Sequence, residues 1–205
     1  NVTFTVSGIS QLGSDNTVGA AVVPGAKISS IPAEWLLGDF SDGITDNKAA
    51  LISGATISAS KNIDYNKLTS GTHTFRGTGL KAGDYWLITL PVIDFEAGVV
   101  NLAFKAYGSG TSPKTFVVEY SLDGNDWKKA DGENDITYDL TTSNTGDSPV
   151  RTVDVKVNEN IPDGTLYIRL KVTSTSPGIT SGSIADGGVT RLMEYFRVTR
   201  TGDLP

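Results

Sequence analysis

One stretch of alternating residues decides the fold, and it reads DYWLITLPVIDFEAG (84–98), VVNLAFKAYGSGTSPK (99–114) and TFVVEYSLDGNDW (115–127). In the second run, apolar side chains recur at every second position from Val100 to Ala106. The third run alternates in the same way from Phe116 to Leu122. Because successive side chains of a strand point to opposite faces, this spacing predicts half-buried antiparallel strands. We expect Pro91 either to end the first strand or to place it at a sheet edge.

The same period continues on both sides of this stretch. Apolar residues alternate with polar ones over 151–157 and 166–172, and the last strand places Leu192, Phe196 and Val198 on one face. By contrast, 61–70 is polar and irregular. No segment keeps an apolar period of 3.6 residues, so little helix is expected, and about ten short strands indicate a two-sheet sandwich. Trp127 is interpreted as a residue that packs against its hairpin. The large aromatic residues predicted to point into the core are Trp86, Phe104, Phe116 and Phe196.

Length and composition limit the class of protein. A chain of 205 residues can bury roughly 70% of the surface that it exposes when unfolded, which is enough for a full core. We expect a single β-sandwich domain over 1–205, with its core at about 35–199. Residues 1–30 are either an edge strand of this sandwich or the remnant of a preceding module. The sequence has no cysteine, so disulfides, thiolate metal sites and cysteine nucleophiles are excluded.

Charge and targeting signals bear on the partners and the location. The net charge is −6 and the basic residues are scattered, which argues against nucleic-acid binding. The sequence contains no run of 18 apolar residues, so no transmembrane segment is predicted. The sequence opens at Asn1 directly into a strand-like alternation, so we expect a mature or trimmed chain whose targeting segment has been removed. A cysteine-free composition rich in Thr, Ser, Gly and Asn fits a secreted or cell-surface protein.

Three segments carry a resemblance to a known group of domains: ITLP (88–91), LAFKAYGSGTSPK (102–114) and VEYSLDGNDW (118–127). They resemble galactose-binding-like jelly rolls in exported proteins of glycan-degrading gut bacteria of the Bacteroidetes type. The run TRLMEYFRV (190–198) is similar to the loop and arginine-bearing strand near the end of such domains. The resemblance implies an all-β, two-sheet antiparallel jelly-roll sandwich. Relatives often have an Asp-Asn pair where this chain has Met193 and Glu194, so no binding residue is carried over.

Catalytic patterns are weak. His73 is the one histidine, and no Gly-x-Ser-x-Gly elbow accompanies it, which disfavours a Ser-His-Asp triad. A paired-histidine metal site is excluded for the same reason. Asp94 and Glu96 flank Phe95 and could act together in glycoside hydrolysis, but solvated carboxylates are the preferred interpretation. We therefore predict a protein that is not an enzyme and assign no catalytic residue.

Two acidic segments, Asp123–Asp126 and Asp131–Asp135, have the composition either of a calcium-binding loop or of a turn. Neither is an EF-hand loop, since the twelfth position counted from Asp131 is Thr142 rather than glutamate. Asp and Asn next to Gly are common turn residues, so turns are the preferred interpretation. No cofactor is predicted, with a structural calcium as the alternative.

Sugar recognition uses aromatic faces and planar polar groups. Loops 108–114 and 174–190 are the best candidates to form a site, and whether they share one end of the sandwich is left open. The predicted function is a non-catalytic carbohydrate-binding module. The alternatives are a structural or adhesive module with a protein partner and, third, a glycoside hydrolase. The candidate ligand-binding residues near strand ends or in loops are Trp35, Tyr65, His73, Arg76, Tyr107, Asp186 and Arg191.

Overall fold

The computed structural model describes residues 33–35, 55–61, 63–67, 73–131, 137–139, 150–175, 183–192 and 196–200. Every regular element in these ranges is a β-strand, and none of them contains a helix able to cross a membrane. In chain order the strands are β1 (Ala33–Trp35), β2 (Thr56–Ala59), β3 (Ile63–Lys67), β4 (His73–Thr78), β5 (Tyr85–Phe95), β6 (Gly98–Gly108), β7 (Thr115–Ser121), β8 (Lys128–Lys129), β9 (Thr137–Asp139), β10 (Val150–Val157), β11 (Ile161–Val172), β12 (Val189–Leu192) and β13 (Phe196–Arg200).

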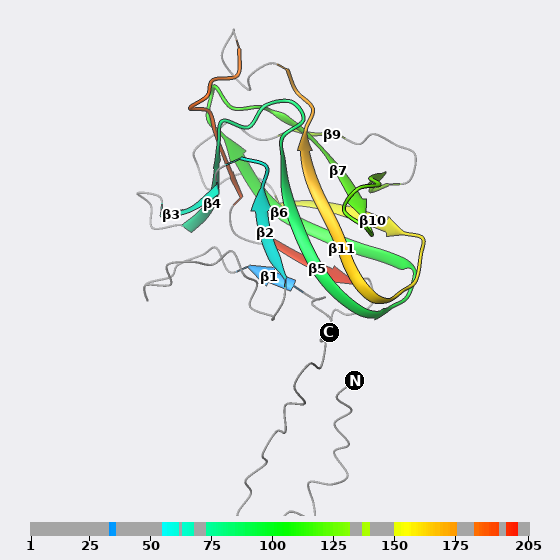
Figure 1. Ribbon diagram of the computed structural model, residues 1–205. Helices are drawn as coiled ribbons and strands as arrows, with labels where there is room; N and C mark the ends of the chain where they lie inside the picture. Colours follow the sequence, from blue (N-terminus) through cyan, green and yellow to red (C-terminus); the bar gives the residue numbers. More distant parts are fainter. Residues whose placement is uncertain are drawn as a thin grey trace, which may run out of the picture.

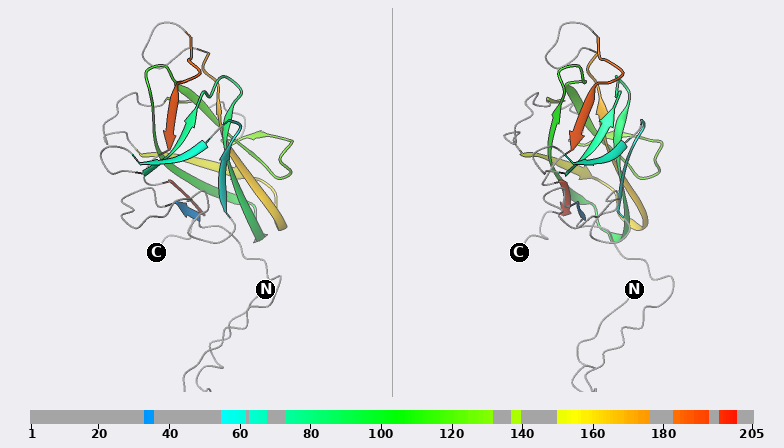
Figure 2. Two further views of the ribbon diagram at one scale, coloured as in Figure 1. Left: turned by 60° about the vertical axis from the view of Figure 1, so that its left-hand side comes forward. Right: turned by 90° about the vertical axis from the view of Figure 1, so that its left-hand side faces the viewer.

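The strands form two antiparallel sheets. The seven-stranded sheet has the order β1-β13-β6-β12-β4-β3, and β10 also pairs with β6. The six-stranded sheet has the order β2-β5-β11-β7-β8, and β9 also pairs with β7. In Figure 1, β5 and β11 run side by side in front of β6, in agreement with their long antiparallel register. Figure 2 shows the same strands from the side, with β12 in orange next to β4.

The path of the chain between the sheets identifies the type of sandwich. From β4 to β7, each strand lies in the sheet opposite to the strand before it, and β10, β11 and β12 continue this exchange. Such alternation wraps the chain around the core, as in double-sheet jelly rolls. The all-β, two-sheet antiparallel jelly-roll sandwich expected from the sequence is thus confirmed.

The core lies between the inner faces of the two sheets. Along β5 the odd-numbered residues from Tyr85 to Ile93 are half-buried, and the even-numbered residues from Trp86 to Val92 are buried. On β6, Val100, Leu102 and Phe104 are fully buried. The core positions predicted for Trp86, Phe104 and Phe116 are confirmed, because they belong to one contiguous cluster of buried side chains. The Phe196 side chain lies outside the described part of the chain.

Two local expectations need comment. Pro91 lies inside β5, and β2 pairs with β5 only as far as Thr89. Pro91 therefore lies beyond the β2 pairing, where β11 is the neighbour of β5 among the described strands, and a strand tolerates proline at such a position. The interpretation of 61–70 as irregular is wrong for β3, which pairs with β4 from Ile63 to Lys67. Backbone hydrogen bonds to β4 form whatever the side chains are, so a polar edge strand lacks the apolar alternation that would reveal it.

Strand β6 differs from a half-buried strand. Its outer face was expected to be exposed, yet Ala103, Lys105 and Tyr107 are 1%, 8% and 3% exposed. β6 has neighbours on both sides, β10 on one and β12 and β13 on the other. The side chains at the centre of the outer face of this sheet are therefore buried between neighbouring strands.

Candidate functional site

A row of polar positions crosses the seven-stranded sheet. Arg191 of β12 lies directly opposite both Arg76 of β4 and Tyr107 of β6. Asp64 of β3 is the next register partner, opposite Arg76. Directly opposed residues of antiparallel strands share one face of the sheet. We call Arg76, Tyr107 and Arg191 the arginine row.

The neighbouring residues show which face this is. Leu192 is opposite Phe75 and Ala106, and all three belong to the buried core. Because side chains alternate along a strand, the arginine row lies on the other face, away from the core. Both arginines are half-buried there.

Contacts inside the row hold Arg191 in place. Its Nη1 donates a hydrogen bond to the Thr74 hydroxyl at 3.1 Å, and its guanidinium carbon lies 5.9 Å from the centre of the Tyr107 ring. Burial raises the pKa of Tyr107, and the nearby Arg191 charge opposes this in part. Tyr107 is therefore neutral at physiological pH. With 3% of its surface exposed, it supports Arg191 and offers no open ring face in this structure.

The two candidate loops lie together at one end of the sandwich. The Ser109 N–H donates to the Val189 carbonyl at 2.8 Å, and the Ala185 N–H donates to the Thr111 carbonyl at 3.1 Å. The Val189 N–H in turn donates to the Ser109 hydroxyl at 2.9 Å. The Ser174 hydroxyl accepts from the N–H groups of 114 and 115, at 3.0 and 3.1 Å. The described parts of both loops thus share the upper end of the molecule in Figure 1.

Asp186 lies in this loop region and not in the arginine row. Its carboxylate pairs with the Lys81 ammonium at 2.6 Å, with 90% of the Asp186 side chain exposed. The hydrogen bond from Lys81, helped by its charge, holds the pKa of Asp186 below its ordinary value. The connection after β4 also reaches this loop region, because the Gly79 N–H donates to the Gly188 carbonyl at 2.9 Å.

Three candidates are placed by backbone register alone. Trp35 lies on β1 opposite 196, Tyr65 on β3 opposite Phe75, and His73 on β4 opposite Lys67. Their side chains fall outside the described part of the chain. Of the seven candidates, the structure brings Arg76, Tyr107 and Arg191 into one row.

The acidic turn after β7 is held by its own hydrogen bonds. The Asp123 carboxylate accepts from the N–H groups of Asn125 and Asp126, both at 2.8 Å, and from the Ser121 hydroxyl at 2.9 Å. These bonds hold the pKa of Asp123 below its ordinary value. The described residues contain no group of three or more metal-ligating side chains. Turn chemistry thus accounts for 123–126, while most of 131–135 lies outside the described ranges.

Trp127 was predicted to pack against its hairpin, and the ring contact that the structure shows is with Arg169 of β11, the strand next to β7. The Arg169 guanidinium carbon lies 3.8 Å from the centre of a Trp127 ring and 5.5 Å from the Tyr85 ring. The same guanidinium pairs with the Glu119 carboxylate at 2.5 Å. Arg169 therefore covers one face of the Trp127 ring.

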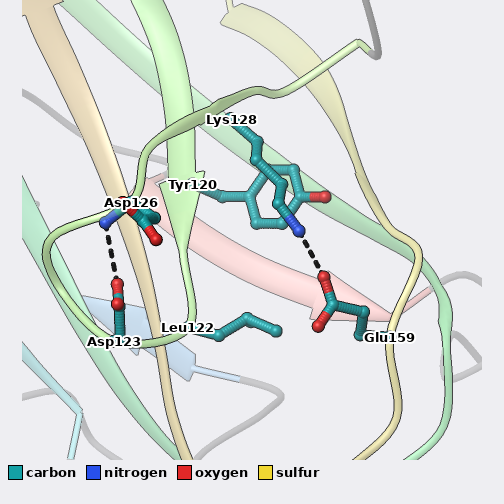
Figure 3. A pocket seen from close by; sticks show the side chains of 6 residues that line it. All are labelled: Tyr120, Leu122, Asp123, Asp126, Lys128 and Glu159. Carbon is teal, nitrogen blue, oxygen red and sulfur yellow. Dashed lines mark hydrogen bonds and ion pairs between the residues drawn. The ribbon is translucent and has the colours of Figure 1, made fainter.

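Sequence reasoning missed a pocket beside this turn. The hollow has a volume of about 250 Å³. Figure 3 shows the Lys128 ammonium pointing toward the Glu159 carboxylate, with which it forms an ion pair. Glu159 comes from the β10–β11 turn, so no local signal joins it to β7. We call this site the turn pocket, and its lining residues are Tyr120, Leu122, Asp123, Asp126, Lys128 and Glu159.

Comparison with known proteins gives matches among solved structures. No family model and no curated protein match the chain. TmCBM61, solved with beta-1,4-galactotriose, has a TM-score of 0.42 and 15% identity over 72% of this chain and 89% of its own. The N-terminal cellulose-binding domain of Cellulomonas fimi beta-1,4-glucanase C has a TM-score of 0.42 and 14% identity, and the match covers 74% of this chain and 91% of that domain. A family 6 carbohydrate-binding module from Clostridium cellulolyticum, solved with xylose, has a TM-score of 0.35 and 18% identity. The match covers 70% of this chain and 91% of that module. The fold assignment rests on the strand pairing of the chain itself.

Proposed function

We propose that this protein binds carbohydrate without catalysis, through the outer face of the seven-stranded sheet at the arginine row. The observation that carries the proposal is the register that sets Arg76 and Arg191 side by side on two paired strands. Guanidinium groups donate hydrogen bonds in a fixed fork, which suits the neighbouring oxygens of a sugar. Strands hold such groups more rigidly than loops do.

The supporting residues favour recognition over chemistry. Thr74 and Tyr107 hold Arg191, so less side-chain entropy is lost when a ligand binds. The loop end adds Asp186, whose carboxylate is exposed and can accept from hydroxyl groups.

The alternative of a protein partner has less support, because the described surface has few exposed apolar side chains. Where side chains are described, Val150 is the one large hydrophobic residue that is exposed, at 46%. Extended protein interfaces usually present larger apolar patches. We further propose an exported or cell-surface location, supported by the composition rich in Thr, Ser, Gly and Asn. Fractionation of the producing cells tests this location, and a purely cytoplasmic protein would contradict it.

The function is tested by affinity electrophoresis in gels that contain neutral or acidic polysaccharides. We expect one glycan class to retard the protein, and a single sugar unit to bind at about millimolar strength. Arg191→Ala should weaken binding by about tenfold, because one charge-assisted donor is lost. Lys171→Ala removes a cation from the other sheet and should leave retardation unchanged. Normal migration in every gel would reject the proposal.

A further inference from the structure

The turn pocket is independent of the arginine row. It is built from β7, β8, the turn between them and the β10–β11 turn, and none of these contributes to the row. A volume of about 250 Å³ is somewhat below the ~300–1,000 Å³ typical of drug-sized sites. The hollow therefore suits one small ring rather than an extended chain.

The inner wall of the pocket contains one polar group, the hydroxyl of Tyr120. Tyr120 is 2% exposed, and Figure 3 shows no hydrogen bond between its hydroxyl and the other residues that line the pocket. Figure 3 shows the ring behind the Lys128 side chain, with the hydroxyl on the side of Glu159. The hydroxyl is not among the fully buried side-chain atoms that lack a partner, so it lies at the pocket surface, where it can donate to or accept from a small molecule. The Leu122 side chain adds an apolar contact on the same wall.

The charges around the pocket favour a cation. Asp123, Asp126 and Glu159 supply three carboxylates against the one ammonium of Lys128, a formal balance of −2. The turn hydrogen bonds keep Asp123 ionised, and Glu159 is paired with Lys128. The whole chain has a net charge of −6, which adds to the attraction.

The spacing of these carboxylates decides what kind of cation fits. No three of them converge as metal ligands do, within the part of the chain that the structure describes. In Figure 3, Asp123 and Asp126 lie on one side of the hollow and Glu159 lies on the other. An extended ligand with donors in several directions can meet both sides, whereas a single metal ion cannot.

We propose that the turn pocket binds a small hydroxylated ammonium compound of the amino-sugar class. The ammonium pairs with Asp126 on one side of the hollow, and the hydroxyl groups reach Tyr120 and Glu159 on the other side. One edge of the sugar ring packs on Leu122.

The test is an amide-shift titration of the full chain by NMR, with glucosamine, N-acetylglucosamine and glucose. These probes share a ring but differ in charge, because glucosamine alone carries an ammonium. We expect glucosamine to shift the amides of 120–128 and 159, at millimolar strength, and to bind at least about tenfold more tightly than the neutral sugars. Equal shifts with N-acetylglucosamine, or no shifts at these amides, would overturn the proposal.

Variants separate this site from the arginine row. Asp126→Asn should weaken glucosamine binding by roughly tenfold, and Tyr120→Phe by a few-fold with the fold intact. Asp131→Asn is the matched control, since Asp131 pairs with Lys156 outside the pocket. Arg191→Ala should leave glucosamine binding unchanged, so failure of one site is distinguished from failure of the other. An Asp126→Asn protein that binds glucosamine as well as the parent would overturn the proposal.

Discussion

At the scale of single residues, the contact between the two loops leaves no room for a side chain at Gly188. A Cβ atom there would lie 2.6 Å from the Thr111 carbonyl oxygen and 3.0 Å from the Ala185 carbonyl oxygen. Both are backbone atoms, so the loops would have to separate. We expect Gly188→Ala to lower the free energy of unfolding by about 1–3 kcal/mol, measured by urea denaturation.

The next residue supplies the control for this prediction. A Cβ added at Gly187 meets nothing within 4 Å. Gly187→Ala should therefore change stability by less than about 1 kcal/mol. Equal losses in the two variants would show that the loop contact does not hold this end of the sandwich.

Asp123 makes stability depend on pH. Its pKa in the folded protein is below the ordinary value of 3.8, so the ionised carboxylate stabilises the fold at higher pH. This contribution is complete above 3.8 and is lost as the pH falls through the lowered value. Asp123→Asn should therefore lower the thermal midpoint at about pH 6, and the difference from the parent should shrink in acid.

Thermal unfolding at a series of pH values checks the Asp123 prediction. Asp126→Asn is the control within the same turn, because the Asp126 N–H, rather than its carboxylate, takes part in the turn hydrogen bond. A deficit of Asp123→Asn that stays constant into acid would contradict the role of the ionised carboxylate.

At the scale of elements, Glu119 and Arg169 join β7 to β11 on the outer face of the six-stranded sheet. Their side chains are 15% and 14% exposed. Glu119→Gln would leave the Arg169 charge poorly compensated in a half-buried position. We expect a loss of roughly 1–3 kcal/mol in the free energy of unfolding.

An exposed ion pair in the same protein gives the comparison. Lys128 and Glu159 are 51% and 52% exposed, so solvent screens their attraction. Glu159→Gln should cost at most about 1 kcal/mol. If both glutamine variants unfold at the same urea concentration, burial does not strengthen the Glu119 pair.

At the scale of the whole molecule, one cluster of buried residues takes side chains from both sheets. Loss of either sheet would expose the core of the other. We expect a single calorimetric transition, with the van't Hoff enthalpy equal to the calorimetric enthalpy. Two resolved transitions would indicate that 1–30 or another segment folds as a separate module.

Predictions from the sequence succeeded for the core-facing residues of the central strands. Val100 to Ala106 and Phe116 to Tyr120 alternate in hydrophobicity, and the predicted inward residues are buried. The prediction failed at β3, where an edge strand needs backbone pairing but no apolar pattern. The candidate site was predicted in part. Arg76, Tyr107 and Arg191 were named as separate candidates, and their common row was not foreseen.

By itself, the sequence determined the strand type, the core-facing residues and the turn at Asp123, because each depends on neighbours a few positions away. Tertiary structure alone decided which distant positions meet. Arg76, Tyr107 and Arg191 share a row, and Glu159 reaches the turn after β7, only through the pairing and packing of strands far apart in the chain. The physical reason is that local alternation sets which way a side chain faces, whereas the order of the strands follows from how the whole core is buried.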